Sequence, residues 1–276
     1  MTAQLPITTA LPAQPRANGA VRLSSKRGAG GSVIDGLFQK GAAKVVFPRS
    51  AIGLTGVLLN TSGGVTGGDR FEYEAAAGPG THLTLTTQAC ERAYRAQPGE
   101  EGRVETRLTV GRDATLWWLP QETLVFDGCA LRRRLHCEVA PGGRALIVEP
   151  LCLGRVAMGE ARVTGMMSDS LTVTRNGAPL VRDAWRLRGD MTAQMARAAV
   201  GGGAGAMVTL TYVTPEAAAL LAPVRALLPS SGGASLLAAD VLALRMLAPS
   251  GYHLRRHLLP ILDHLTQGHL PLCWRL

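Results

Sequence analysis

The sequence predicts a mainly β protein with a many-stranded, layered β-sheet architecture and about two C-terminal helices. Three observations lead to this prediction. From about residue 21 to residue 213, apolar residues repeatedly alternate with small or polar ones, a period typical of strands with one buried face. Turn residues recur every ~8–12 positions, which by pattern alone favours a sandwich or a barrel. Helical spacing is found only after residue 213.

The clearest strands are residues 81–86, 104–110 and 206–212, where apolar side chains alternate with polar ones. Residues 171–181 add a hairpin, because Asn176-Gly177 tolerates the positive φ angles of a type I′ turn. No internal repeat of fixed period is present, so the sequence does not favour a solenoid.

Two helices are predicted near the C-terminal end. Thr214-Pro215-Glu216 offers a capping residue, a first-turn proline and an early acid before residues 217–228. Residues 252–267 form the second candidate, which Pro260 should kink or restart. Residues 235–248 also have helical spacing, and the pattern alone leaves them ambiguous.

The composition favours one domain. The chain has 276 residues, 46% of them hydrophobic, and no linker-like change of composition divides its middle. Residues 1–17 read as a flexible N-terminal segment, and residues 18–276 as a single β-rich domain. We find neither a secretory signal nor an apolar stretch of ~20 residues, and therefore expect a soluble, cytoplasmic protein.

Charge and cysteine content narrow the classes of partner. The net charge of +9 suits nucleic acid, an anionic surface or an acidic protein. Aromatic residues are only 4% of the chain, which argues against nucleic acid, and Arg132-Arg133-Arg134 is typical of a solvated strand face. Five cysteines without a Cys-x-x-Cys pair predict buried free thiols rather than disulfides or structural zinc.

The glycine-rich segment, residues 59–70, resembles a phosphate loop but lacks its chemistry. It contains Gly63-Gly64 and Gly67-Gly68, yet no Gly-Lys-Ser/Thr ending follows, and the next residues predict a strand rather than a helix. We also find no nucleophile elbow and no His-Glu-x-x-His helix. The sequence therefore offers no anchor for an enzyme.

Two sets of residues could bind metal. His253, His257 and His264 would lie near one face of an unbroken helix, and imidazole suits nickel, copper or zinc. Pro260 interrupts that set and no acid or cysteine completes it, so surface histidines are the favoured interpretation. The second set consists of three acids in strand-rich segments, Asp69, Glu149 and Asp183. Their side chains could point inward and bind metal, or they could form ordinary salt bridges and turns.

Several motifs, in this order, resemble the urease accessory protein family UreD, also called UreH. Beyond the glycine-rich segment ending at Asp69, they are Leu85-Thr86-Thr87-Gln88-Ala89-Cys90 with Tyr94-Arg95, Leu119-Pro120-Gln121-Glu122-Thr123-Leu124-Val125-Phe126-Asp127-Gly128, and Leu153-Gly154-Arg155 with Gly159-Glu160. The resemblance extends from about residue 21 to the C-terminal residues and implies a strand at 235–248. At Cys90 the family usually has a small residue without a thiol.

The resemblance implies a non-catalytic scaffold that binds apo-urease, UreF and UreG and passes nickel through a water-filled interior channel. No tightly bound cofactor is implied, only transient nickel. Carboxylates suit such a channel, because their binding can be weak enough to release the ion. By motif position we expect Asp69, Glu149 and Asp183 to line it. The alternatives are a metal-dependent hydrolytic enzyme and a basic nucleic-acid-binding protein.

Overall fold

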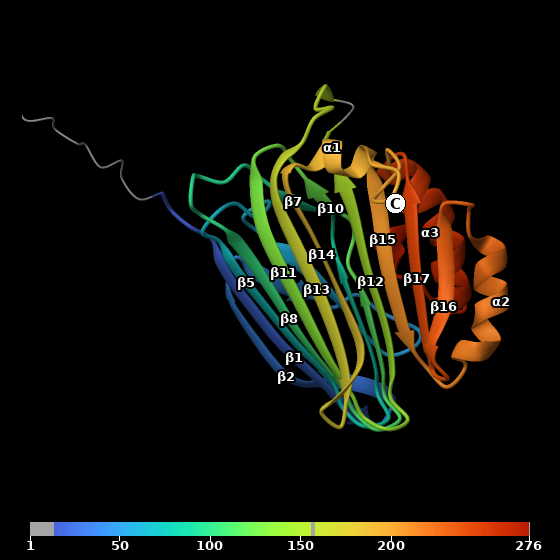
Figure 1. Ribbon diagram of the computed structural model, residues 1–276. Helices are drawn as coiled ribbons and strands as arrows, with labels where there is room; N and C mark the ends of the chain where they lie inside the picture. Colours follow the sequence, from blue (N-terminus) through green and yellow to red (C-terminus); the bar gives the residue numbers. More distant parts are fainter. Residues whose placement is uncertain (1–13, 156–157, 276) are drawn as a thin grey trace, which may run out of the picture.

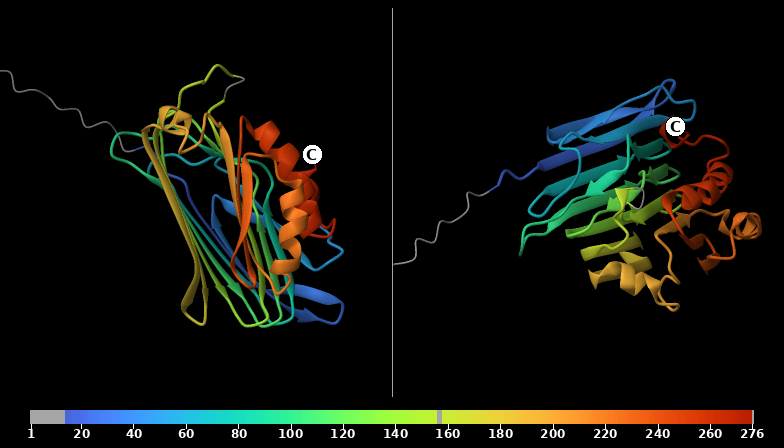
Figure 2. Two further views of the ribbon diagram at one scale, coloured as in Figure 1. Left: turned by 45° about the vertical axis from the view of Figure 1, so that its right-hand side comes forward. Right: turned by 90° about the horizontal axis from the view of Figure 1, so that it is seen from above.

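The computed structural model describes residues 14–155 and 158–275, which form three layers (Figures 1 and 2). Two β-sheets face each other, and helices cover the far side of one of them. The prediction of a mainly β, layered architecture is confirmed. None of the described helices is both long and apolar enough to span a membrane.

Sheet A contains the seven strands β1 (Asn18–Gly28), β2 (Gly31–Gly41), β5 (Arg70–Ala77), β8 (Gly102–Val110), β11 (Cys129–Val139), β13 (Thr164–Arg175) and β14 (Ala178–Asp190). Their order is β14-β13-β11-β8-β5-β1-β2. The inner strands pair in parallel, whereas β2 and β14 close the two edges as antiparallel hairpin partners.

Sheet B contains the ten strands β3 (Ala43–Val46), β4 (Leu54–Asn60), β6 (His82–Thr87), β7 (Glu91–Ala93), β9 (Thr115–Leu119), β10 (Thr123–Val125), β12 (Arg144–Leu153), β15 (Ala206–Val213), β16 (Gly232–Ala238) and β17 (Val241–Ala248). The main order is β16-β17-β15-β12-β9-β6-β4-β3. The short strand β10 pairs with both β12 and β7.

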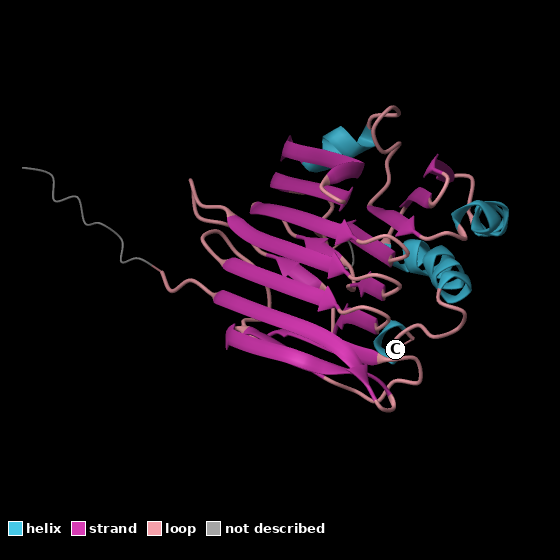
Figure 3. Cartoon of the chain, turned by 90° about the horizontal axis from the view of Figure 1, so that it is seen from below, coloured by secondary structure: helices cyan, strands magenta, loops and turns pink. Residues whose placement is uncertain are grey.

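The chain winds back and forth between the two sheets from β4 to β13, so neighbouring strands pair in parallel, as in a solenoid (Figure 3). Arg70 pairs with Arg103, Arg103 with Arg132, and Arg132 with Ser168. The number of residues between paired positions therefore differs from one turn of the winding to the next. The winding leaves no fixed period in the sequence, and for this reason the sequence alone did not favour a solenoid.

Two hydrophobic cores hold the layers together. The first lies between the sheets, where Leu83 and Leu116 of sheet B pack with residues such as Leu108 of sheet A. The second lies between sheet B and the helices, and includes Leu146 of β12 and Leu258 of the last α-helix. The central strands β9 and β12 of sheet B are therefore apolar on both faces.

The helices are α1 (Met191–Ala196), α2 (Ala217–Leu227) and α3 (Gly251–Leu265), followed by the short 3-10 helix η2 (Leu272–Trp274). The two predicted C-terminal helices are confirmed as α2 and α3. Ser250 caps α3 through its side chain, and α3 continues through Pro260 as one helix. The six-residue α1 was not predicted; the Asp190 side chain caps it by accepting from the backbone N–H of Ala193.

Two further local predictions are confirmed. Asn176 and Gly177 have φ angles of 50° and 75°, as the predicted turn between β13 and β14 requires. Residues 235–248 fall within β16 and β17 rather than in a helix. Of the proposed N-terminal segment, residues 1–13 lie outside the described part of the chain.

Candidate functional site

Arg133 is the centre of a buried polar cluster between the two sheets. It extends from β11 in sheet A and contacts Asp169 at 2.5 Å and Glu149 of sheet B at 2.8 Å. Arg133 also donates to Thr123 Oγ1 at 2.7 Å, and Trp118 Nε1 donates to Glu149 at 2.6 Å. Because removing a charge from water is costly, each of these groups depends on the others.

Two hollows adjoin this cluster, with volumes of about 60 and 10 Å³. Leu135, Glu149 and Asp169 line both of them. The smaller is about the size that one water molecule needs, and Asp183 and Thr209 also line it. The structure therefore brings two of the predicted acids, Glu149 and Asp183, to one interior space.

Asp183 lies on β14 and is closer to solvent than Glu149. Its side chain is 27% exposed, against 15% for Glu149, and it pairs with Arg245 of β17 at 2.5 Å. Thr209 Oγ1 is buried beside it and has no hydrogen-bond partner among the described residues. The smaller hollow thus has a partly exposed acid and a buried acid in its wall.

A further acid, Glu91 on β7, lines the larger hollow. Asn60 Nδ2 donates to its two carboxylate oxygens at 3.2 and 3.1 Å. Within the described ranges, no group of three or more His, Cys, Asp or Glu side chains is placed to hold a metal ion together. Glu91 lines only the larger hollow, Asp183 only the smaller one, and Glu149 lines both.

Burial changes the protonation of these acids. It raises the pKa of Glu149, although the nearby Arg133 works against the rise. It also raises the pKa of Glu91, and the hydrogen bond from Asn60 opposes it. Both carboxyl groups therefore hold a proton to a higher pH than exposed glutamates do, and a cation reaching them competes with that proton.

Asp69, the third predicted acid, lies elsewhere and lines neither hollow. It is buried in the loop before β5, where Oδ1 accepts from the backbone N–H of Ala17 at 2.7 Å and Oδ2 from that of Thr66 at 2.8 Å. Gly68 before it has a φ of 84°, which favours glycine in this tight turn. The glycine-rich segment is a turn that this carboxylate closes.

The segment before β10 connects the interior cluster to the helix layer. Arg255 of α3 donates to Gln121 Oε1 at 2.8 Å and contacts Glu122 at 3.1 Å, while the adjacent Thr123 accepts from Arg133. Cys90 donates to Glu122 at 3.3 Å. Burial, with a contribution from Glu122, raises the pKa of Cys90 to about 11, so at neutral pH it is a thiol.

Comparison with known proteins decides the family. A sequence model described as UreD urease accessory protein matches residues 17–275. The chain belongs to the UreD family. It is 49% identical over 244 residues to urease accessory protein UreD of Ruegeria pomeroyi, covering 88% of this chain and 95% of that protein. The UreD protein of Roseobacter denitrificans is 47% identical over 263 residues, covering 95% of this chain and 96% of its own.

This membership confirms the resemblance found in the sequence. The chain is a urease accessory protein involved in urease maturation and nickel insertion, and UreD family proteins are non-catalytic. The alternative of a hydrolytic enzyme is therefore wrong.

Sequence reasoning missed Arg133 and Asp169. The arginine triplet was assigned to a solvated face, and this is correct for Arg132 and Arg134 but wrong for Arg133. Leu131 and Leu135 are buried, so the residue midway between them must also point inward. That alternation was the available signal for Arg133, and also for Asp169, which lies between the buried Met167 and Leu171.

Proposed function

We propose that this chain binds apo-urease together with UreF and UreG in the cytoplasm, and guides nickel along the acids between its two sheets. The observation that carries the proposal is that Glu149 and Asp183 line one interior hollow. Family membership supports the maturation complex, and nickel is its transient cargo rather than a resident cofactor.

The chemistry of this space suits transfer better than retention. Carboxylate and water oxygens bind a borderline cation such as Ni²⁺ without the strength of thiolates. Arg133 already occupies one oxygen of Glu149 and one of Asp169, so an arriving ion must compete with a fixed cation. Weak binding at successive positions is what conduction requires.

Asp69 has a different role in this proposal. Because both of its oxygens accept backbone hydrogen bonds, it fixes the loop that leads into β5. Its contribution to nickel guidance is then indirect, through the position of the strands around the hollows.

The test is urease activation in a strain that has the urease genes but lacks its own UreD. Asp183→Asn and Glu149→Gln should lower activity severalfold while apo-urease and UreF still co-purify with the variant.

Each of these two variants has a matched control. Asp263 also pairs with an arginine, at 2.6 Å, and is 34% exposed, so Asp263→Asn controls for Asp183→Asn. Glu122 is buried and paired with Arg255, so Glu122→Gln controls for Glu149→Gln. Equal activity in variants and controls would contradict the proposed path.

A further inference from the structure

The outer face of sheet A carries many arginines because of strand alternation. In β11, β13 and β14 the odd-numbered residues include buried apolar side chains such as Leu135, Leu171 and Leu187. The even-numbered residues therefore point away from the core. They include five arginines, which we call the arginine surface: Arg132, Arg134, Arg182, Arg186 and Arg188.

The strand register places these arginines side by side. Arg132 of β11 pairs with Ser168 of β13, which pairs with Arg186 of β14. In the next outward-facing row, Arg134 pairs with Ser170, which pairs with Ala184 of β14. Because the intervening side chains are short, a hollow of about 430 Å³ lies between the arginines. Asp169, already bound to Arg133, is the carboxylate in its wall.

The charges of the arginine surface are largely uncompensated. Arg132 pairs with Glu101 at 2.9 Å. The other four, Arg134, Arg182, Arg186 and Arg188, form no ion pair with any residue in the ranges 14–155 and 158–275. Like charges gathered on one face of a sheet repel one another, so an anionic partner would relieve the repulsion.

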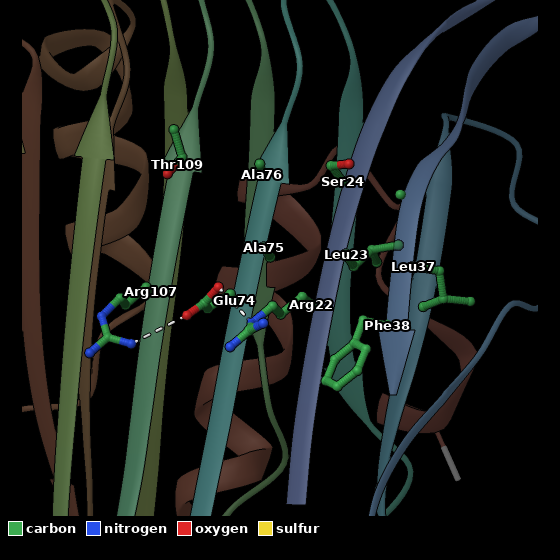
Figure 4. A pocket seen from close by; sticks show the side chains of 11 residues that line it. Arg22, Leu23, Ser24, Leu37, Phe38, Glu74, Ala75, Ala76, Arg107 and Thr109 are labelled. Carbon is green, nitrogen blue, oxygen red and sulfur yellow. Dashed lines mark hydrogen bonds and ion pairs between the residues drawn. The ribbon is translucent and has the colours of Figure 1, made fainter. Parts of the chain in front are cut away.

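On the other half of the same face, formed by β1, β5 and β8, arginines are paired with glutamates. Figure 4 shows Glu74 between Arg22 and Arg107, at 3.1 and 3.3 Å. Arg107 also contacts Glu105 at 3.2 Å. The excess of positive charge is therefore local to β11, β13 and β14. Figure 2 shows α2 and α3 beyond sheet B, on the other side of the molecule from this face.

We propose that the arginine surface docks an acidic segment of a partner protein. Guanidinium groups bind carboxylates in a bidentate manner, and the serine hydroxyls between them add hydrogen-bonding groups. A continuous phosphate backbone fits less well, because three acids adjoin the surface: Glu101 in the loop before β8, Glu105 on β8 and Glu138 on β11. A short acidic segment would avoid them. The inference rests on the proposed partner binding but not on the nickel path.

The direct experiment measures binding of a fluorescein-labelled poly-L-glutamate peptide to the full-length chain at several salt concentrations. Arg134→Gln/Arg186→Gln should weaken binding about five- to tenfold, as expected for two exposed charge contacts. The matched control, Arg22→Gln/Arg107→Gln, removes two arginines from the half formed by β1, β5 and β8 and should bind within about twofold of wild type. Equal weakening in the two variants would overturn the proposal.

A single-stranded RNA of similar length, used as a second probe, separates the rival class of partner. If RNA binds more tightly than the peptide and the first variant abolishes that binding, the surface is a nucleic-acid site and the proposal is wrong. Co-purification of co-expressed apo-urease and UreF then tests the partner assignment. If neither protein co-purifies with the wild-type chain, the proposed partner binding is wrong. The peptide titration still decides whether the arginine surface binds an acidic segment.

Discussion

Arg133 shows how a single position determines the interior of this protein. It is the cation that both Glu149 and Asp169 contact, and it joins the two sheets beside the larger hollow, which Glu91 also lines. A buried ion pair of this kind adds little net stability, but the loss of one partner leaves the others unpaired in a dry environment.

Replacement of Arg133 by methionine should therefore be severe. We expect Arg133→Met to lower the free energy of unfolding by about 3–5 kcal/mol, because two buried acids lose their counter-ion. Urea denaturation followed by circular dichroism measures the change. Arg134→Met, at the next and exposed position, should change it by less than about 0.5 kcal/mol; similar losses in the two variants would refute the buried-cluster assignment.

Asp69 gives a second prediction of this kind. Asp69→Ala leaves the backbone N–H groups of Ala17 and Thr66 without their acceptors, so we expect a loss of about 2–4 kcal/mol in the free energy of unfolding. Asp35→Ala, an exposed acid on β2, is the control. If Asp69→Ala unfolds like wild type but abolishes urease activation, Asp69 acts on the ion and not on the loop.

Two of the three predicted acids, Glu149 and Asp183, line one interior hollow for a physical reason. In each case the residues two positions away on either side pack in the core between the sheets, so strand alternation directs the acid to the same inner face. Asp69 follows a glycine-rich turn, where alternation does not apply and only the folded loop reveals the N–H groups that it binds. Asp169 lies between Met167 and Leu171, both buried, so the same alternation directs it inward although Ser168 and Ser170 flank it.

The elements that pack on sheet B create a different environment, centred on His82 of β6. Its ring lies edge-on to that of Trp117, with 4.4 Å between the ring centroids. Both residues line a hollow of about 440 Å³, together with Arg144, Glu216, His264 and His269. Burial lowers the pKa of His82 to about 4, with a further contribution from His269. In the unfolded chain the same group titrates near its ordinary value of about 6.5.

Between pH 6.5 and 4 the unfolded chain therefore binds more protons at this position than the folded chain, so stability falls as the pH falls. We expect wild type to lose about 1–2 kcal/mol at His82 between pH 7 and pH 5, allowing for partial screening by solvent. His82→Gln should lose correspondingly less. Thermal unfolding at both pH values measures this, with the exposed His253→Gln as control; a wild-type pH response in His82→Gln would contradict the assignment.

The sequence pattern predicted elements where a local signal was strong, missed one that was short, and left one ambiguous where its spacing fitted both helix and strand. The Asn176-Gly177 turn and the start of α2 each follow from residues adjacent in sequence. The six residues of α1 are too few to establish a period. Residues 235–248 satisfy helical spacing, yet they form strands because β17 pairs with β15 and its apolar residues pack on both faces of sheet B.

The overall arrangement of the chain explains how the candidate path forms. Successive strands alternate between the sheets, so Arg133 of sheet A and Glu149 of sheet B meet across the interior. The unequal coil lengths hid this winding from the sequence, although layered sheets and terminal helices were predictable. No local pattern specifies which strands face each other, and the two hollows depend on that pairing.

The central claim is that nickel reaches urease through the interior acids of this chain. Its most direct measurement is the nickel content of urease matured in the purified complex, with an excess of chelator added after nickel loading. We predict that wild type still fills the urease sites, because nickel between the sheets is shielded from solvent, and that Glu149→Gln/Asp183→Asn leaves them largely empty with the complex intact. Equal filling by wild type and the double variant would contradict the account.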